Sequence, residues 1–330
     1  MKKKILVTPR TFGKADPVPM EMLREAGCEV ISNPYGRLLT EEEMSALIED
    51  VDGIIVGLDP LNASVLSKAK RLKAISKYGV GVNNIDLEYA SKRGILVANT
   101  PGANSLAVAE LTIGLMFAVA RRICLSDRNI RQGRWQQYPG LQVKGKVMGL
   151  IGTGQIGRDT AELARGLGMQ VICCDIHPDD EWAASIGARY VTLQEIITDA
   201  DYISIHVPLT EDTRCMISKK ELWQMKPSAV LINTARGGIV DEQALFEALK
   251  EGRIAGAGLD VFEAEPLTNS RLVELDNVVL TSHIGAHTRE AVENMGRLAA
   301  ANLLAMLRGE IPKYIVNQIA DGGVEDASAS

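Results

Sequence analysis

Histidine, aromatic residues and long apolar runs are all scarce in this 330-residue chain. Only 4% of its residues are aromatic, and it has four histidines, so proton transfer by imidazole has four candidates. They are His177, His206, His283 and His287. The most hydrophobic stretch, Leu111 to Ala120, is too short to cross a hydrocarbon core, which needs about 20 residues. We therefore expect no membrane partner.

Cysteine pairs and an excess of basic charge are also absent. The five cysteines include no Cys-x-x-Cys pair, which favours neither a disulfide framework nor a zinc site. Lys and Arg number 36 against 42 Asp and Glu, a charge of −6 that is untypical of nucleic-acid proteins. The apolar run after the N-terminal lysines stops at Thr8, too soon for a secretory signal. These absences predict a cytoplasmic protein with no metal and no nucleic-acid partner.

Short β-branched runs alternate with amphipathic segments along most of the chain. Such alternation is typical of parallel sheets covered by helices on both faces. The first series of expected strands comprises Ile5–Thr8, Cys28–Ser32, Gly53–Val56, Leu72–Ser76 and Ile95–Ala98. The second comprises Lys146–Ile151, Gln170–Asp175, Tyr202–Val207, Ala229–Asn233, Gly258–Phe262 and Asn277–Thr281. We predict an α/β fold with two doubly wound parallel-sheet domains.

One long apolar segment separates the two series. A helix is expected from about Ser105 to Gly133, and its stretch Leu106–Leu125 is apolar nearly all round. Such a helix must be buried, against either a partner subunit or its own domain's core. A last helix, expected over Thr288–Arg308, could return to the first sheet. We therefore predict a discontinuous domain of residues 1–99 and 288–330, a second domain of residues 100–287, and a cleft between them.

A glycine motif, Gly152-Thr153-Gly154-Gln155-Ile156-Gly157, follows the expected strand that ends at Ile151 and opens a helical pattern. Its first glycine allows a tight turn, its second lets the backbone approach a pyrophosphate, and its third lets helix and strand pack closely. The next strand ends in Asp175, a carboxylate suited to ribose hydroxyls and repelled by a 2′-phosphate. The motif predicts NAD rather than NADP. The alternative is a glycine-rich turn that binds no ligand.

Three polar segments follow later strands, at the positions where open α/β sheets bind their ligands. They contain Arg236, Glu265 and His283. Hydride transfer at an alcohol carbon needs a proton acceptor, and histidine suits this near neutral pH. An anionic substrate needs a cation, and the arginine fork binds a carboxylate through two parallel hydrogen bonds. A glutamate bonded to the histidine would hold its tautomer. The alternative is a structural ion-pair network.

In order and spacing, these motifs resemble those of the NAD-dependent D-2-hydroxyacid dehydrogenases, most closely the phosphoglycerate-dehydrogenase-like branch without a C-terminal regulatory domain. The resemblance runs from about Ile5 to Val316. Its further motifs are Gly79–Asp86, Thr100–Ser105 and His206–Thr210. It implies a flavodoxin-like substrate domain and a Rossmann NAD-binding domain. It also implies hydride transfer between NAD(H) and C2 of a small anionic D-2-hydroxyacid or 2-oxoacid.

The resemblance also implies roles for single residues. His283 would be the general acid/base, Glu265 would orient it, and Arg236 would bind the substrate carboxylate. The other side of the substrate would meet Tyr78, Gly79, Val80, Gly81 and Asn104. NAD would meet Gly152, Gly154, Gln155, Ile156, Gly157, Asp175, Val207, Pro208, Thr234, Asp260 and Gly285. The helix from about Ser105 would be the family's dimer helix, which implies a homodimer.

One segment departs from the phosphoglycerate dehydrogenase pattern. That branch generally carries an arginine–serine pair after the third strand to bind the substrate phosphate, whereas this chain has Gly57-Leu58-Asp59 there. Lys77 or Arg10 could bind a second anionic group instead. The substrate stays open between 3-phosphoglycerate, glycerate/hydroxypyruvate and other polar 2-hydroxyacids. The alternative function is a non-catalytic NAD(H)-sensing protein that resembles transcriptional corepressors on the same scaffold.

The three remaining histidines have less reactive interpretations. His206 lies on an apolar strand, which favours a packed, hydrogen-bonded side chain. His177 follows Asp175 in a loop, which favours a solvated position. His287 lies four residues beyond His283 and is the one competitor for the acid/base role. We interpret it as a residue at the start of a helix or at the rim of the site.

Overall fold

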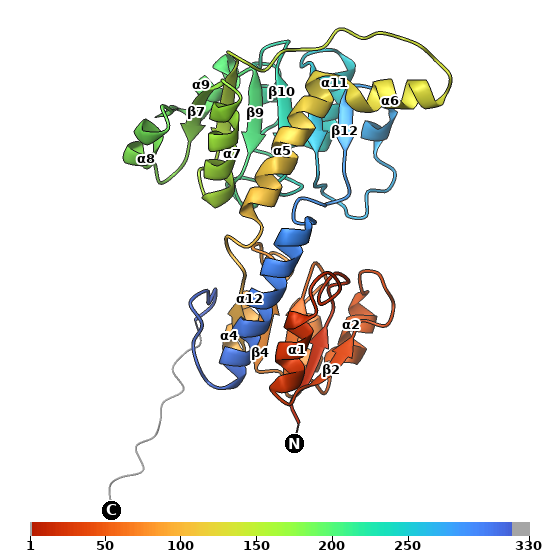
Figure 1. Cartoon of the computed structure of the whole chain (residues 1–330), viewed down its shortest axis with the longest axis vertical. Coiled ribbons are helices and arrows are strands. Elements are labelled where there is room, and N and C mark those ends of the chain that lie inside the picture. Colours follow the sequence, from red (N-terminus) through yellow and green to blue (C-terminus); the bar gives the residue numbers. More distant parts are fainter. Residues whose placement is uncertain (1, 319–330) are drawn as a thin grey trace, which may run out of the picture. The chain divides into compact units, whose positions relative to one another are not determined.

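The computed structural model describes residues 2–318, which fold into two compact units (Figure 1). The first unit runs through Asn104 and resumes at Thr288, and the second is Ser105–His287. Residues 319–330, which the sequence analysis places in the discontinuous domain, lie outside the described residues.

The first unit is built on a five-stranded sheet with the order β2-β1-β3-β4-β5. Its strands are β1 (Lys4–Val7), β2 (Glu29–Ser32), β3 (Gly53–Val56), β4 (Ala74–Lys77) and β5 (Leu96–Ala98). Every pairing in this sheet is parallel. This is the flavodoxin-like order, in which ligands bind outside the carboxyl ends of the strands.

Helices cover both faces of the first sheet because its strands are apolar on both sides. The helices are α1 (Val18–Glu25), α2 (Glu41–Ile48), α3 (Ala63–Lys68), α4 (Leu87–Lys92) and α12 (Arg289–Leu307). Ile5 of β1 packs in a cluster with Leu303 of α12, whereas the next residue, Leu6, packs with Met44 of α2 on the other face. The Ser76 hydroxyl of β4 donates a hydrogen bond of 2.8 Å to the Ala299 carbonyl of α12. The chain's last long helix is therefore part of the first unit.

The second unit is built on a seven-stranded sheet with the order β12-β11-β10-β9-β6-β7-β8. Its strands are β6 (Val147–Ile151), β7 (Gln170–Cys174), β8 (Arg189–Tyr190), β9 (Tyr202–Ile205), β10 (Val230–Asn233), β11 (Gly256–Leu259) and β12 (Val278–Leu280). All pairings are parallel, and the order reverses between β6 and β9, as in a Rossmann domain. The predicted fold class is confirmed for both units.

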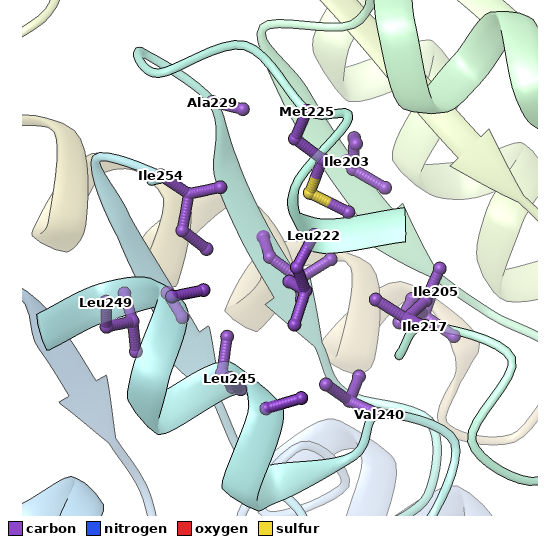
Figure 2. Packing of buried hydrophobic residues seen from close by; sticks show 14 of the residues in the cluster. Ile203, Ile205, Ile217, Leu222, Met225, Ala229, Val240, Leu245, Leu249 and Ile254 are labelled. Carbon is purple, nitrogen blue, oxygen red and sulfur yellow. The ribbon is translucent and has the colours of Figure 1, made fainter. Parts of the chain in front are cut away.

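Helices also cover both faces of the second sheet. They are α5 (Ser105–Ala120), α6 (Ile123–Arg131), α7 (Gln155–Gly166), α8 (Asp180–Ser185), α9 (Leu193–Asp199), α10 (Lys219–Leu222) and α11 (Glu242–Lys250), with a 3₁₀ turn at Arg271–Glu274. Figure 2 shows part of the core on the α10 and α11 side, where Leu222 and Leu245 pack with Ile203. On the other face, Leu115 of α5 packs in a second cluster. No helix in the described part of the chain is long and apolar enough to cross a membrane.

The single long helix predicted over 105–133 is wrong, because the structure divides it into α5 and α6. Arg122 adopts a left-handed backbone conformation with φ of 51°, which interrupts the helical path. The Leu141 amide donates to the Ala120 carbonyl over 2.8 Å, so the returning chain occupies the end of α5. This contact is distant in sequence, which is why the apolar pattern alone did not locate the break.

The predicted strand Gly258–Phe262 is also misplaced, because β11 begins at Gly256 and ends at Leu259. A Cβ atom on Gly256 would lie 2.6 Å from a methyl group of Val119, and one on Gly258 would lie 3.0 Å from the Leu115 Cβ. The strand therefore uses glycines where α5 packs closely, and it lacks the β-branched residues that predict strands. Asp260 consequently lies in the loop after the strand.

Candidate active site

The glycine motif forms a tight turn between β6 and α7. Gly152 has φ of 98°, and a Cβ there would lie 2.8 Å from the carbonyl carbon of His206. A Cβ on Gly157 would lie 2.2 Å from the Gly152 oxygen, so both positions need glycine. By contrast, a Cβ on Gly154, the N-cap of α7, would meet no atom within 4 Å. Open space beside exposed helix N-terminal amides fits the pyrophosphate of a dinucleotide.

The Asp175 carboxylate, at the end of β7, is bonded to this turn. Its Oδ2 accepts from the Thr153 amide at 2.6 Å and from the Thr153 hydroxyl at 3.0 Å, and its Oδ1 accepts from the His177 amide at 2.9 Å. Burial opposes the charge, but these hydrogen bonds outweigh it and lower the pKa of Asp175. The residue is therefore an anion beside the turn. Thr153, for which the sequence predicts no role, connects the glycine turn to Asp175. Its hydroxyl also lies 2.8 Å from the Tyr190 hydroxyl.

Other predicted NAD-binding residues lie on the same edge of the second sheet. Gln155 begins α7 and donates to Asp159 at 2.8 Å, and Ile156 follows it in the same helix. Val207 and Pro208 lie just beyond β9, with Pro208 exposed. The Thr234 hydroxyl, just beyond β10, is 2.9 Å from the Thr112 hydroxyl of α5.

The Arg236 loop follows β10 and is held by Asn233. The Asn233 side chain donates to the Arg236 carbonyl at 2.8 Å and accepts from the Ala235 amide at 3.0 Å. Arg236 is partly buried, and its Nη1 donates to the Ala235 carbonyl at 2.6 Å. Burial lowers the pKa of Arg236, an effect that Glu265 partly opposes. Arginine keeps its charge in proteins, so the loop presents a poorly hydrated cation.

The Arg236 loop and the Glu265 loop meet at Gly237. A Cβ on Gly237 would lie 2.0 Å from the carbonyl carbon and oxygen of Phe262, and 2.4 Å from the Glu263 amide nitrogen. No side chain fits there without moving one of the two backbones. The glycine therefore brings the arginine and the glutamate to neighbouring positions.

Glu265 and His283 form a direct hydrogen bond between the loops that follow β11 and β12. The His283 Nδ1 lies 2.7 Å from Glu265 Oε2, and the Phe262 amide donates to Glu265 Oε1 at 3.0 Å. Burial opposes the charge, but the His283 hydrogen bond and charge, with the Phe262 amide, lower the pKa of Glu265 on balance. An ionised carboxylate accepts hydrogen bonds only, so Nδ1 carries a hydrogen and Nε2 is the ring nitrogen directed elsewhere.

The Asp260 carboxylate is buried and bonded to the loop that carries His283. It accepts hydrogen bonds from the Thr281 hydroxyl at 2.6 Å and from the Ile284 and Gly285 amides at 2.8 Å each. Both Asp260 and Gly285 are predicted to meet NAD, and the structure bonds them to each other. The Thr281 contact had no sequence signal, because it depends on β11 and β12 being neighbours.

In the first unit, the predicted substrate loop follows β4. The Tyr78 amide donates to the Val56 carbonyl at 2.9 Å, and the Gly79 amide donates to the Thr100 hydroxyl at 2.9 Å. The amides of Val80 and Gly81 donate to no acceptor among residues 2–318. The side-chain oxygen of Asn104 is buried and receives no hydrogen bond within the same described residues. Of the predicted loop amides, two are thus engaged and two are available.

The expectation that Lys77 binds a second anionic group is wrong. Lys77 is 2% exposed, and its ammonium group donates to Asn84 Oδ1 at 2.9 Å and to the Gly57 carbonyl. Asp59, also 2% exposed, accepts from the Thr8 hydroxyl and from the Leu39 amide at 2.9 Å. Burial excludes both charged groups from a ligand in solution. Arg10, the other predicted cation, is exposed and donates to the Gly36 carbonyl at 3.2 Å.

The remaining histidines differ in burial and in their contacts. His206 Nε2 lies 2.9 Å from the Ser204 hydroxyl, and burial lowers the pKa of His206 to about 4. His177 is exposed. His287 is exposed too, with its amide donating to the Ile284 carbonyl at 2.8 Å. Within the described residues, no three His, Cys, Asp or Glu side chains are grouped to hold a metal ion.

Comparison with known proteins identifies the family. The family model described as D-isomer specific 2-hydroxyacid dehydrogenase, NAD binding domain, matches residues 113–285. The glyoxylate reductase of Thermococcus litoralis is 47% identical over 281 residues, covering 82% of this chain and 85% of the relative. The D-3-phosphoglycerate dehydrogenase of Methanocaldococcus jannaschii is 42% identical over 319 residues, covering 95% of this chain but 59% of the relative.

Solved structures extend the likeness to the fold. The D-lactate dehydrogenase of Aquifex aeolicus, complexed with NAD and lactic acid, has a TM-score of 0.83 at 30% identity and covers 96% of this chain and 100% of its own. A glyoxylate reductase from Paecilomyes thermophila has a TM-score of 0.84 at 30% identity, with coverages of 96% and 98%. These relatives are enzymes, which favours catalysis over the NAD(H)-sensing alternative. The chain belongs to the D-isomer specific 2-hydroxyacid dehydrogenases and is an NAD-dependent member of that family.

Proposed function

We propose that this enzyme reduces a small unphosphorylated 2-oxoacid, such as glyoxylate or hydroxypyruvate, with His283 as the general acid. The observation that carries the proposal is the 2.7 Å hydrogen bond between His283 and Glu265, on loops at the carboxyl edge of the NAD-binding sheet. Arg236 lies on the loop that touches the Glu265 loop at Gly237. A cation, an acid and its orienting carboxylate are the groups that reduction of a 2-oxoacid requires.

In this reaction, one residue of the chain would stabilise negative charge and another would transfer the proton. Bound NADH supplies the hydride that adds to C2 of the oxoacid. Arg236 binds the substrate carboxylate and polarises the C2 oxygen, and His283 Nε2 gives that oxygen its proton. Glu265 stabilises the imidazolium before transfer and keeps the hydrogen on Nδ1 afterwards. In the reverse direction the neutral His283 takes the hydroxyl proton.

NAD would be held by the glycine turn and Asp175, and the substrate by backbone amides and Asn104 of the first unit. The Gly152–Gly157 turn would receive the pyrophosphate, and the Asp175 carboxylate would accept from the ribose hydroxyls. In the first unit, the Val80 and Gly81 amides would bind the substrate carboxylate, because the Tyr78 and Gly79 amides are engaged. The buried oxygen of Asn104 would accept a hydrogen bond from the bound ligand.

The preference for an unphosphorylated substrate rests on the stretch after β3. A phosphate would need a free cation there, whereas the chain carries Asp59, and the nearby Lys77 is closed off by Asn84 and the Gly57 carbonyl. Because Asp59 and Lys77 are both buried, neither is available to bind a second anionic group. Several of the relatives, including those of Thermococcus litoralis and Pyrococcus furiosus, are glyoxylate reductases, which supports the same choice.

A panel of oxoacids tests the proposal. NADH oxidation would be measured with glyoxylate, hydroxypyruvate and 3-phosphohydroxypyruvate, using wild-type enzyme and His283→Ala. We expect kcat/KM to be at least about tenfold higher for an unphosphorylated acid. We expect His283→Ala to lower kcat by about 10²–10⁴-fold while NADH still binds, as seen by its fluorescence. Wild-type turnover in the variant would exclude the acid role, and a preference for the phosphorylated acid would exclude the substrate class.

We also propose that the enzyme is a cytoplasmic homodimer formed through α5 and α6. Large apolar side chains are exposed along this one stretch, with Leu106 54% exposed, Ile123 51%, Ile130 50% and Trp135 86%. Monomeric proteins seldom expose several such groups together. Light scattering should therefore give twice the chain mass of 35.7 kDa, and a mass of one chain would contradict the dimer.

A further inference from the structure

We infer that Asp260 and Thr281 are positioning residues that fix the backbone of His283, an inference that rests on the proposed acid role of His283. The resemblance assigns Asp260 to NAD binding and gives Thr281 no role. The geometry points to a different task for the pair. It joins the loops beyond two neighbouring strands, β11 and β12, and the second of these loops carries His283.

The backbone at His283 needs external support. Its φ is 55°, in the left-handed region that side-chain-bearing residues rarely adopt. Glu265 contacts only the ring, through Nδ1, so it orients the imidazole without determining where the Cα lies. Whatever holds the backbone therefore sets the position from which the ring reaches the substrate.

Asp260 supplies that support at His283 and at the two residues that follow it. Its backbone carbonyl accepts from the His283 amide at 2.9 Å, and its carboxylate accepts from the Ile284 and Gly285 amides at 2.8 Å. Three consecutive amides are thus bonded to one residue that is 1% exposed. Hydrogen bonds from amides to a buried carboxylate are short and strong. A Cβ on Gly285 would lie 3.2 Å from Asp260 Oδ2, so glycine keeps the approach open.

Thr281 fixes the carboxylate itself. Its hydroxyl donates to Asp260 Oδ1 at 2.6 Å, the same oxygen that accepts from the Ile284 amide. The Asp260 amide in turn donates to the Asn233 carbonyl at 3.0 Å, and the Asn233 side chain donates to the Arg236 carbonyl. A continuous chain of hydrogen bonds therefore links the proposed acid to the proposed carboxylate-binding arginine. Small displacements of such groups are costly, because the proton donor must reach a substrate oxygen.

Threonine variants give the cleanest test, because Thr281 belongs to neither the catalytic nor the NAD-binding set. Thr281→Val removes the hydroxyl at nearly constant shape, Thr281→Ser keeps it, and Thr198→Val makes the same change on the surface of α9. We expect Thr281→Val to lower kcat about tenfold, with KM for glyoxylate and the Kd of NADH within about twofold of wild type. Thr281→Ser and Thr198→Val should keep the wild-type kcat. Equal kcat values for Thr281→Val and Thr281→Ser would overturn the inference.

Asp260→Asn provides a second, stronger variant. An amide cannot accept all three hydrogen bonds, so we expect kcat at saturating NADH to fall about 10²-fold. The NMR signal of the His283 Nδ1 hydrogen should broaden in Asp260→Asn and Thr281→Val, and it should remain in Thr281→Ser. A loss confined to the Kd of NADH would instead assign Asp260 to the cofactor and overturn the positioning role.

The outcomes also separate this inference from the proposed function. If His283→Ala keeps its turnover, the acid role itself is excluded. If His283→Ala abolishes turnover while Thr281→Val and Asp260→Asn keep the wild-type kcat, the acid role stands and only the positioning inference is wrong.

Discussion

The carboxyl edge of the first sheet and that of the second use polar residues in opposite ways. In the first unit, Asp59 and Lys77 are each 2% exposed, and Asp59 accepts from the Leu39 amide while Lys77 donates to Asn84, both in the same unit. In the second, the side chains of His283 and Glu265 remain 24% and 25% exposed although they are bonded to each other. Both edges hold charged side chains, so charge alone does not identify a reactive group. The difference lies in what remains accessible.

The second edge stays accessible because its supporting groups form a separate, buried layer. Asn233 and Asp260 are 2% and 1% exposed. The Asn233 side chain bonds to the backbone of the Arg236 loop, and the Asp260 carboxylate bonds to the backbone of the His283 loop. The imidazole of His283 therefore does not have to stabilise its own loop. In the first unit, Asn84 accepts from Lys77 and donates to the Gly57 and Asp59 carbonyls. Lys77 also donates to the Gly57 carbonyl, so this charged side chain itself supports the loop. The polar edge of a sheet can serve as a reactive site when buried residues stabilise the loops and other, accessible side chains are left to react.

Glu265→Gln should give the largest effect and tests the comparison on the second edge. We expect kcat to fall by about 10²–10³-fold, because a neutral amide no longer stabilises the imidazolium of His283. The free energy of unfolding should change by less than about 1 kcal/mol, because the partly exposed glutamate supports little of the fold. Steady-state kinetics and urea unfolding measure the two quantities. A large loss of stability with little loss of kcat would mean that both edges are structural.

Much of this edge could be predicted from the sequence, because it depends on local patterns. The glycine motif, Asp175 and the polar segments after apolar strands all lie where parallel strands end, and the structure places them there. The Asp260–Thr281 bond, the Gly237 contact and the end of α5 could not be predicted, since each depends on segments brought together by the fold. Lys77 shows the same limit, because its position predicted a ligand-binding cation and its burial contradicts that.

Asp59→Asn tests the first edge and should give a smaller effect of the opposite kind. The amide can keep only part of the hydrogen bonding to the Thr8 hydroxyl and the Leu39 amide, so the free energy of unfolding should fall by about 2 kcal/mol. Turnover of glyoxylate should stay within about twofold, since this carboxylate does not meet the substrate. A fall in kcat/KM without a fall in stability would show that Asp59 contacts the ligand.

His206 extends the comparison within the second unit, as a partly buried polar group with no proposed catalytic role. Burial lowers its pKa to about 4, so between pH 6.5 and 4 the unfolded chain takes up a proton that the folded chain does not. Stability from this group is complete above pH 6.5 and is lost as the pH falls toward 4. Between pH 6.5 and 5 this loss amounts to about 1.5 kcal/mol, and we expect it to disappear in His206→Gln. Urea unfolding of both proteins across this pH range measures the difference, and parallel curves would contradict it.

Asp175 combines both behaviours, because one carboxylate supports the glycine turn and also faces the expected ribose site. Asp175→Ala should lower the preference for NADH over NADPH about tenfold, measured as the ratio of kcat/KM values, because the charge that repels a 2′-phosphate is lost. Asp175→Asn separates the two roles, since its amide oxygen can still accept from the Thr153 amide. If repulsion sets the preference, both variants lose it to a similar extent. If Asp175→Asn keeps the wild-type ratio and only Asp175→Ala loses it, the residue acts through the turn.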